Sequence, residues 1–122
     1  MREVLYLFGG DGEQAVRLRK TLAPLRVMVR TVPPEQYHHS IGYLAGDKTC
    51  PSVQTPYEGE PFAQPLLLFA GFGSGRMDQV LSALRRGGLR IDYKAVLTPT
   101  NRTWTAPDLY REIAREHEQL SR

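Results

Sequence analysis

Two short apolar runs, at residues 4–8 and 65–69, are the most hydrophobic segments of the chain. Neither run contains a charged residue, and glycine follows closely at Gly9 and Gly71. An unbroken apolar run of this length that ends near glycine is typical of a strand buried on both faces of a sheet. The sequence therefore predicts two central strands, one in each half of the chain.

Two other segments alternate between apolar and polar residues, at positions 25–31 and 89–97. A period of two is typical of a strand with one wetter face. Pro33 and Pro34 end the first of these segments, since proline lacks the backbone donor that a continuing strand uses. We expect both segments to be edge strands of the same sheet.

Apolar residues recur at helical spacing in the intervals between and after these strands, which predicts helices over residues 12–22, 34–46, 74–86 and 105–120. Asp11, Ser74 and Thr105 are suited to cap three of these helices, because their side-chain oxygens accept from free backbone N–H groups. Gly46 and Gly87 suit C-terminal ends.

The order strand, helix, strand, helix thus occurs twice, and the two opening runs resemble each other, which favours an internal duplication. The prediction is one domain over residues 1–122, with halves 1–46 and 65–122. Residues 47–64 contain three prolines and little periodicity, and are interpreted as a surface connection.

Two sheets agree with this order. We predict an α+β domain with a ferredoxin-like split βαβ sheet, in which the first and third strands are central. The alternative is an α/β doubly wound, four-stranded parallel sheet. In either sheet the third and fourth strands run in the same direction, so residues 71–76 and 98–104 should share one rim. The turn at residues 9–11 joins that rim only in the parallel sheet.

Composition narrows the class of protein. The 122 residues are 41% hydrophobic and 24% charged, as in a globular domain. A single Cys50 and the lack of a long apolar stretch or a signal-peptide pattern predict a soluble, cytoplasmic protein without a disulfide. The net charge of +3 is spread along the chain, so nucleic-acid binding is permitted but not favoured.

The turn after the fourth predicted strand carries polar and aromatic groups at Thr98, Thr100, Asn101 and Trp104. The hydroxyl and amide groups could bind the polar edge of a ligand while the indole stacks on a planar part of the same ligand. Alternatively, the threonines and Asn101 bond their own backbone, and Trp104 fills the core beside the last helix.

A glycine-rich turn that leads from a strand into a helix contains Gly73, Ser74, Gly75 and Arg76. Such a turn can bring backbone N–H groups and a guanidinium close to an anion. It matches neither a dinucleotide fingerprint nor a P-loop, and it equally fits a tight turn with a capping serine.

No metal site, cofactor or catalytic set is predicted. His38 and His39 are adjacent, so on a helix they would point to different faces, and one cysteine gives no ligand pair. Cys50 is interpreted as an incidental thiol. Without a nucleophile and base at recognisable spacing, the sequence favours a binding domain over an enzyme.

The phrase at residues 93–104, YKAVLTPTNRTW, and the later phrases LYREI and EH resemble a bacterial family, domain of unknown function 3783. The resemblance covers roughly residues 65–120. It implies a compact bacterial domain and assigns no role to any residue.

Two functional hypotheses remain. The first is a regulatory or binding domain whose rim, with Arg76, Asn101 and Trp104, recognises a small anionic or nucleotide-like ligand. The second is a protein-interaction module, in its simplest form a homodimer that covers the apolar residues of the edge strands.

Overall fold

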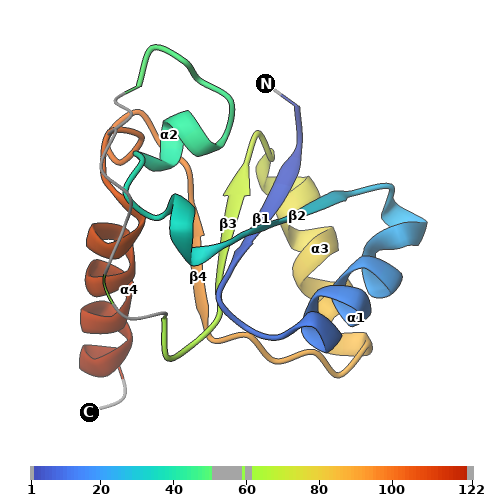
Figure 1. Ribbon diagram of the computed structural model, residues 1–122. Helices are drawn as coiled ribbons and strands as arrows, with labels where there is room; N and C mark the ends of the chain where they lie inside the picture. The colour runs from blue at the N-terminus through green and yellow to red at the C-terminus, as the bar shows by residue number, and fades with distance from the viewer. Residues whose placement is uncertain (1, 51–58, 60–61, 121–122) are drawn as a thin grey trace.

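A four-stranded sheet forms the middle of the molecule in the computed structural model, which describes residues 2–50, 59 and 62–120 (Figure 1). The strands are β1 (Val4–Phe8), β2 (Met28–Val32), β3 (Leu66–Ala70) and β4 (Tyr93–Val96). The helices are α1 (Gly12–Leu22), α2 (Ile41–Leu44), α3 (Ser74–Arg86) and α4 (Ala106–Leu120), with short 3₁₀ turns η1 (Ala23–Leu25) and η2 (Pro34–Gln36).

The strand order is β2-β1-β3-β4, and the sheet is mixed. β1 is parallel to β2 and β3 is parallel to β4, whereas the two central strands are antiparallel with Tyr6 opposite Leu68. The prediction that the first and third strands are central is confirmed, as is the α+β class.

The finer topology differs from both sheets considered. In a split βαβ sheet each helix carries the chain over an inserted strand, whereas here each edge strand lies beside the central strand of its own half. The antiparallel central pair also contradicts the parallel sheet. Hydrophobic patterns mark which strands are buried on both faces, but they do not encode which edge strand lies on which side.

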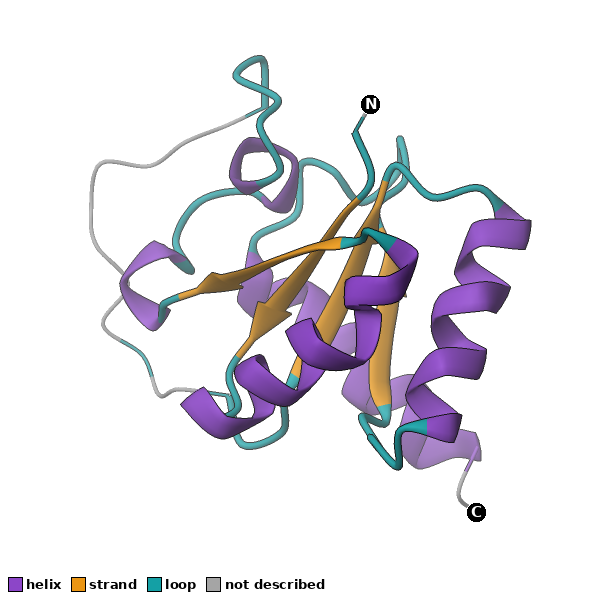
Figure 2. Ribbon diagram, turned by 90° about the vertical axis from the view of Figure 1, so that its right-hand side faces the viewer, coloured by secondary structure: helices purple, strands orange, loops and turns teal. Residues whose placement is uncertain are grey.

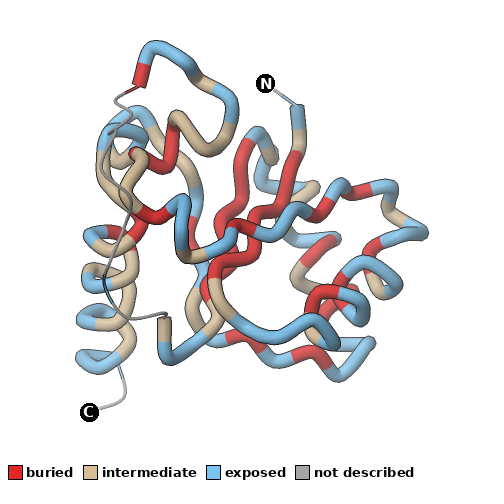
Figure 3. The backbone as a smooth tube through the Cα atoms, viewed as in Figure 1, coloured by how far each residue is buried: buried red, intermediate tan, exposed pale blue. Residues whose placement is uncertain are grey.

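Helices cover both faces of the sheet (Figure 2). α1 and α3 pack on one face, where the core includes Leu5, Leu67 and Phe69. α4, η2 and α2 cover the other face over Tyr6 and Leu68. Both central strands are therefore buried along their whole length (Figure 3), which explains why their sequences are apolar without alternation.

Two helix starts agree with the predicted caps and one does not. Asp11 accepts from the backbone N–H of Gln14 at 2.7 Å and completes a capping box, and the hydroxyl oxygen of Thr105 accepts from the backbone N–H of Asp108 at 3.3 Å. Ser74 is not a cap, because α3 begins at Ser74 itself after Gly73, whose position has no side-chain cap.

The predicted helix over residues 34–46 is wrong for most of its length. The segment forms η2, a turn and the four-residue α2. Its backbone instead bonds the turn before α4: the N–H of Ile41 donates to the carbonyl of Trp104, and the N–H of Gly42 donates to the carbonyl of Arg102, each at 2.8 Å. These tertiary hydrogen bonds replace the continuation of a helix.

Both edge strands are shorter than predicted. Leu25 lies in η1 and Arg26 has a positive φ of 58°, so β2 starts only at Met28. Leu89 and Ile91 are buried but precede β4. Of the predicted connection, residues 51–58, 60 and 61 lie outside the described residues.

Candidate functional site

The turns after β3 and β4 lie at the same end of the sheet, as predicted, because these strands are parallel neighbours. The turn at residues 9–11 lies at the opposite end, because β1 runs antiparallel to β3. The carboxyl ends of β3 and β4 thus form one rim, which is where open sheets with helices on both faces commonly bind ligands.

Arg76, the predicted anion-binding residue of this rim, has three protein partners. Its Nε donates to the Glu3 carboxylate at 3.1 and 3.2 Å, its Nη2 to the carbonyl of Leu25 at 2.6 Å, and its Nη1 to the Gln79 side chain at 3.0 Å. The guanidinium therefore connects the start of α3 to the first half of the chain.

The glycines that precede Arg76 lie in open surroundings. A Cβ added to Gly73 or Gly75 would meet nothing within 4 Å, so neither position requires glycine for a close approach of protein atoms. Gly71 has a φ of 81°, a backbone conformation that favours glycine over other residues. Ser74 is exposed in the first turn of α3. Ligand binding by these residues remains a prediction.

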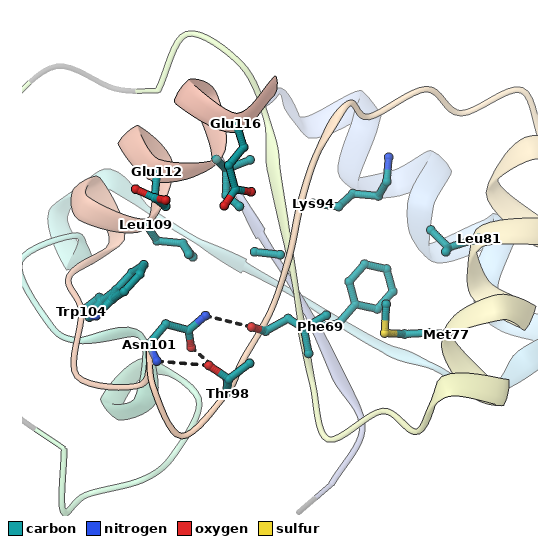
Figure 4. Close-up of a pocket in the computed structure, with 13 residues that line it drawn as sticks. Phe69, Met77, Leu81, Lys94, Thr98, Asn101, Trp104, Leu109, Glu112 and Glu116 are labelled. Carbon is teal, nitrogen blue, oxygen red and sulfur yellow. Dashed lines mark hydrogen bonds between the residues drawn. The ribbon is translucent and has the colours of Figure 1, made fainter. Parts of the chain in front are cut away.

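Asn101 and Thr98 bond each other in the turn after β4 (Figure 4). The Asn101 side-chain oxygen accepts from the Thr98 backbone N–H at 2.8 Å, and the Thr98 hydroxyl accepts from the Asn101 backbone N–H at 3.1 Å. The Asn101 amide nitrogen donates to the Val96 carbonyl at 2.9 Å. Thr100 is exposed at the tip of the turn. This geometry matches the alternative in which the turn bonds its own backbone.

Trp104 is half-buried and packs against the core on the α4 side of the sheet. It also lines a cavity of about 430 Å³ that Thr98 and Asn101 share. Three predicted site residues are thus brought together there, whereas Gly73, Ser74, Gly75, Arg76 and Thr100 do not line this cavity.

We call this cavity the β4 groove, because it follows the outer edge of β4 between α3 and α4 (Figure 4). Its lining comes from both neighbouring helices, both strands of the second half and the turn after β4: Phe69, Met77, Leu81, Lys94, Ala95, Val96, Thr98, Asn101, Trp104, Leu109, Glu112, Ile113 and Glu116.

Among the described residues, β4 pairs only with β3, so its outer edge is open. The Leu97 N–H donates to the carbonyl of Phe69 on β3, whereas the Val96 carbonyl is turned away and accepts from Asn101. Lys94 precedes Val96 by two residues, so its backbone N–H and carbonyl also face outward. Val96 leaves 37% of its area exposed at this edge.

Charges in the β4 groove are concentrated on α4. Glu112 and Glu116 line that wall one helical turn apart, and Glu112 pairs with Arg115. On the strand, the Lys94 ammonium donates to the carbonyl of Ile91 at 2.6 Å. Apart from Lys94, Thr98 and Asn101 the rest of the lining is apolar, so the groove offers one acidic wall and a largely hydrophobic surface elsewhere.

Sequence analysis missed the two walls of this groove. Met77, Leu81, Leu109 and Ile113 follow the helical spacing from which we predicted only the two helices. Leu81 and Ile113 are in fact only half-buried. The signal that was missed is that the apolar stripes of both helices include residues that lie beyond the outer edge of β4, where no strand of the described residues covers them.

Cys50 and the adjacent histidines have different surroundings from those expected. Cys50 is buried and its thiol donates to the Asp47 carboxylate at 3.4 Å; burial first, and then this bond, raise the pKa of the Cys50 thiol. The prediction that His38 and His39 point apart is wrong, because they lie in a turn with ring centroids 3.9 Å apart. Burial, followed by the neighbouring His38 and Lys48, lowers the pKa of His39.

Comparison with known proteins finds one family. Residues 65–120 match a family model described as Domain of unknown function (DUF3783). The matched segment contains β3, α3, β4 and α4, and therefore the whole β4 groove. No curated protein and no solved structure matches the chain. No helix among the described residues is long and apolar enough to cross a membrane.

Proposed function

We propose that residues 65–120, which match the DUF3783 family model, make the protein a peptide-binding interaction module. In this proposal an extended segment of a partner protein adds a fifth strand to β4 and lies in the β4 groove. The observation that carries it is the open, partly apolar β4 edge with a helix on either side.

Strand addition uses groups that the edge already presents. The backbone N–H and carbonyl of Lys94 face outward and can pair with an incoming main chain. Met77 and Leu81 on one side and Leu109 and Ile113 on the other offer apolar contacts to side chains above and below the added strand. Backbone pairing supplies affinity in this mode, and the side-chain contacts supply selectivity.

A second copy of the chain fits this edge less well than a lone strand. Antiparallel pairing of β4 with β4 across a two-fold axis would bring like faces together, so α4 would meet its own copy. Neighbouring strands lie about 4.8 Å apart, whereas packed helices need about 8–10 Å between axes. The Glu112 and Glu116 carboxylates would also approach their copies. These costs favour a segment without a helix of its own.

A small anionic ligand, the first hypothesis from the sequence, has less support. Arg76 is bonded to Glu3, Leu25 and Gln79, and the groove wall on α4 carries carboxylates that repel anions. The groove thus supports the second hypothesis, protein interaction, with a peptide segment in place of a homodimer.

The test is a selection of random peptides of about twelve residues against the intact protein, followed by affinity measurement on two variants. Val96→Lys places a charge in the groove. Met28→Lys is the matched control, because Met28 is a similarly exposed apolar residue on the opposite edge strand, at 39% against 37%. We expect Val96→Lys to weaken binding at least about tenfold and Met28→Lys to leave it unchanged.

Hydrogen exchange gives the second readout. The backbone amide of Lys94 should become protected when the selected peptide is bound, because strand pairing occupies it. Failure to enrich any peptide, or equal loss of binding in both variants, would overturn the proposal. A concentration-dependent dimer that Val96→Lys abolishes would assign the edge to a second copy instead.

A further inference from the structure

The two walls of the β4 groove differ in chemistry, and this difference bears on the partner. The α3 wall, with Met77 and Leu81 beside Phe69, is apolar except for Lys94, which lies on the same face of β4 and whose ammonium donates to the carbonyl of Ile91. The α4 wall has apolar Leu109 and Ile113 close to the strand, with the Glu112 and Glu116 carboxylates among its lining residues. Figure 4 shows the two walls on opposite sides of β4.

Alternate side chains of an added strand would meet different walls. On β4, Ala95 belongs to the core on the α4 side, whereas Val96 is the partner of Phe69, which packs on the α3 side. Side chains of a strand alternate between the faces of a sheet, and a paired fifth strand follows the same alternation. Every second residue of the added segment therefore faces α4, and the residues between them face α3.

The α4 wall selects for positive charge. Glu112 and Glu116 lie at i and i+4, where like charges repel each other slightly. Arg115 pairs with Glu112, while within the described residues Glu116 has no ion-pair partner. A lysine or arginine side chain can lay its aliphatic part along Leu109 and Ile113 and bring its charged end to these carboxylates.

One end of the edge is already occupied. The Asn101 amide bonds the Val96 carbonyl, so an incoming strand cannot pair with that group while the turn is intact. Pairing is then confined to the outward-facing groups up to the Val96 N–H, which limits the added strand to a few residues. A short pairing length increases the weight of the side-chain contacts in selecting the partner.

We infer that the segment bound at β4 is a basic amphipathic strand, with lysine or arginine at the positions that face Glu112 and Glu116 and apolar residues at the positions that face Met77 and Leu81. This inference rests on the proposed function and names the chemistry of its partner. It distinguishes this partner from an acidic or neutral strand of equal hydrophobicity.

Three synthetic peptides of about eight residues test the inference, each with valine at every second position and lysine, serine or glutamate between. Binding of fluorescein-labelled peptides to the intact protein is followed by anisotropy at low and high salt. We expect the lysine peptide to bind about tenfold more tightly than the serine peptide at low salt, and the glutamate peptide to bind most weakly. The preference should shrink at about 0.5 M salt.

The double variant Glu112→Gln, Glu116→Gln should abolish the preference for lysine and leave the affinity for the serine peptide unchanged. Glu118→Gln is the matched control, because Glu118 is on the same helix and does not line the groove. It should behave as the unmodified protein.

The outcomes separate the inference from the proposed function. Equal affinity for the lysine and serine peptides, with both weakened by Val96→Lys, would overturn the basic partner and retain strand addition. If no peptide binds, or if Val96→Lys changes no affinity, strand addition fails and the inference fails with it.

Discussion

The two edge strands differ in how well they are protected against pairing with a further strand, although each is parallel to the central strand of its own half. On β2, Arg30 and Thr31 are exposed, and the Arg30 Nε lies 3.3 Å from the Met28 sulfur on the same strand. Pro33 and Pro34 follow directly. Charged side chains and nearby prolines are devices that discourage further strand pairing.

On β4 the corresponding protection is weaker. The single charge, on Lys94, is bonded back to the carbonyl of Ile91, and Val96 is exposed. The larger difference is in the layer that covers the sheet. The second half contributes the fifteen-residue α4, whereas the first half contributes η2 and the four-residue α2. The strand topology is alike at both edges, so the groove at β4 depends on the long covering helix α4.

Removing the Asn101 side chain should have the largest effect on the difference between the edges. Asn101→Ala loses the bonds to the Val96 carbonyl and the Thr98 N–H, so we expect the free energy of unfolding to fall by about 1–3 kcal/mol. Urea denaturation measures it. Thr100→Ala, at the exposed tip of the same turn, should change stability by less than about 0.5 kcal/mol. Equal stability of both variants would show that Asn101 does not secure the edge.

A smaller effect is expected at Arg76, which connects the second half to the first. Arg76→Ala loses bonds to Glu3 and Leu25 in a partly exposed site, so the unfolding free energy should fall by about 1–2 kcal/mol. Added phosphate should not raise the melting temperature of either protein. If the variant is as stable as the parent but loses a stabilisation by phosphate, the guanidinium binds an anion as the sequence suggested.

The sequence was sufficient for features that depend on local pattern. The unbroken run in β1 and the capping pair of Asp11 and Gln14 located a central strand and the start of α1 correctly. It was not sufficient where distant groups decide. The backbone N–H groups of Ile41 and Gly42 donate to the carbonyls of Trp104 and Arg102, some sixty residues away, and no local spacing of residues predicts these hydrogen bonds. The groove was missed for the same reason, since its walls come from separate helices.

The smallest expected effect concerns Tyr6, which lies beside Arg30 on the β2 side of the sheet. Burial raises the pKa of the Tyr6 hydroxyl, and the positive charge of Arg30 opposes this rise. Because the folded-state pKa exceeds the unfolded value, the native state holds its proton longer than the unfolded chain does. Stability should therefore be unaffected by Tyr6 below about pH 10 and should decline above it. Urea denaturation across that range measures the decline.

Two variants and a control test whether Tyr6 causes this decline in stability and whether Arg30 on β2 sets its pKa. Tyr6→Phe should remove the part of the decline that comes from Tyr6. Arg30→Gln removes the opposing charge, so it should raise the pKa of Tyr6 further, which absorbance at 295 nm can follow as a delayed ionisation. Lys94→Gln, on the opposite edge strand, should leave the ionisation of Tyr6 unchanged, because β3 lies between Tyr6 on β1 and Lys94 on β4. An equal change in both charge variants would mean that net charge, and not the neighbouring guanidinium, sets the ionisation of Tyr6.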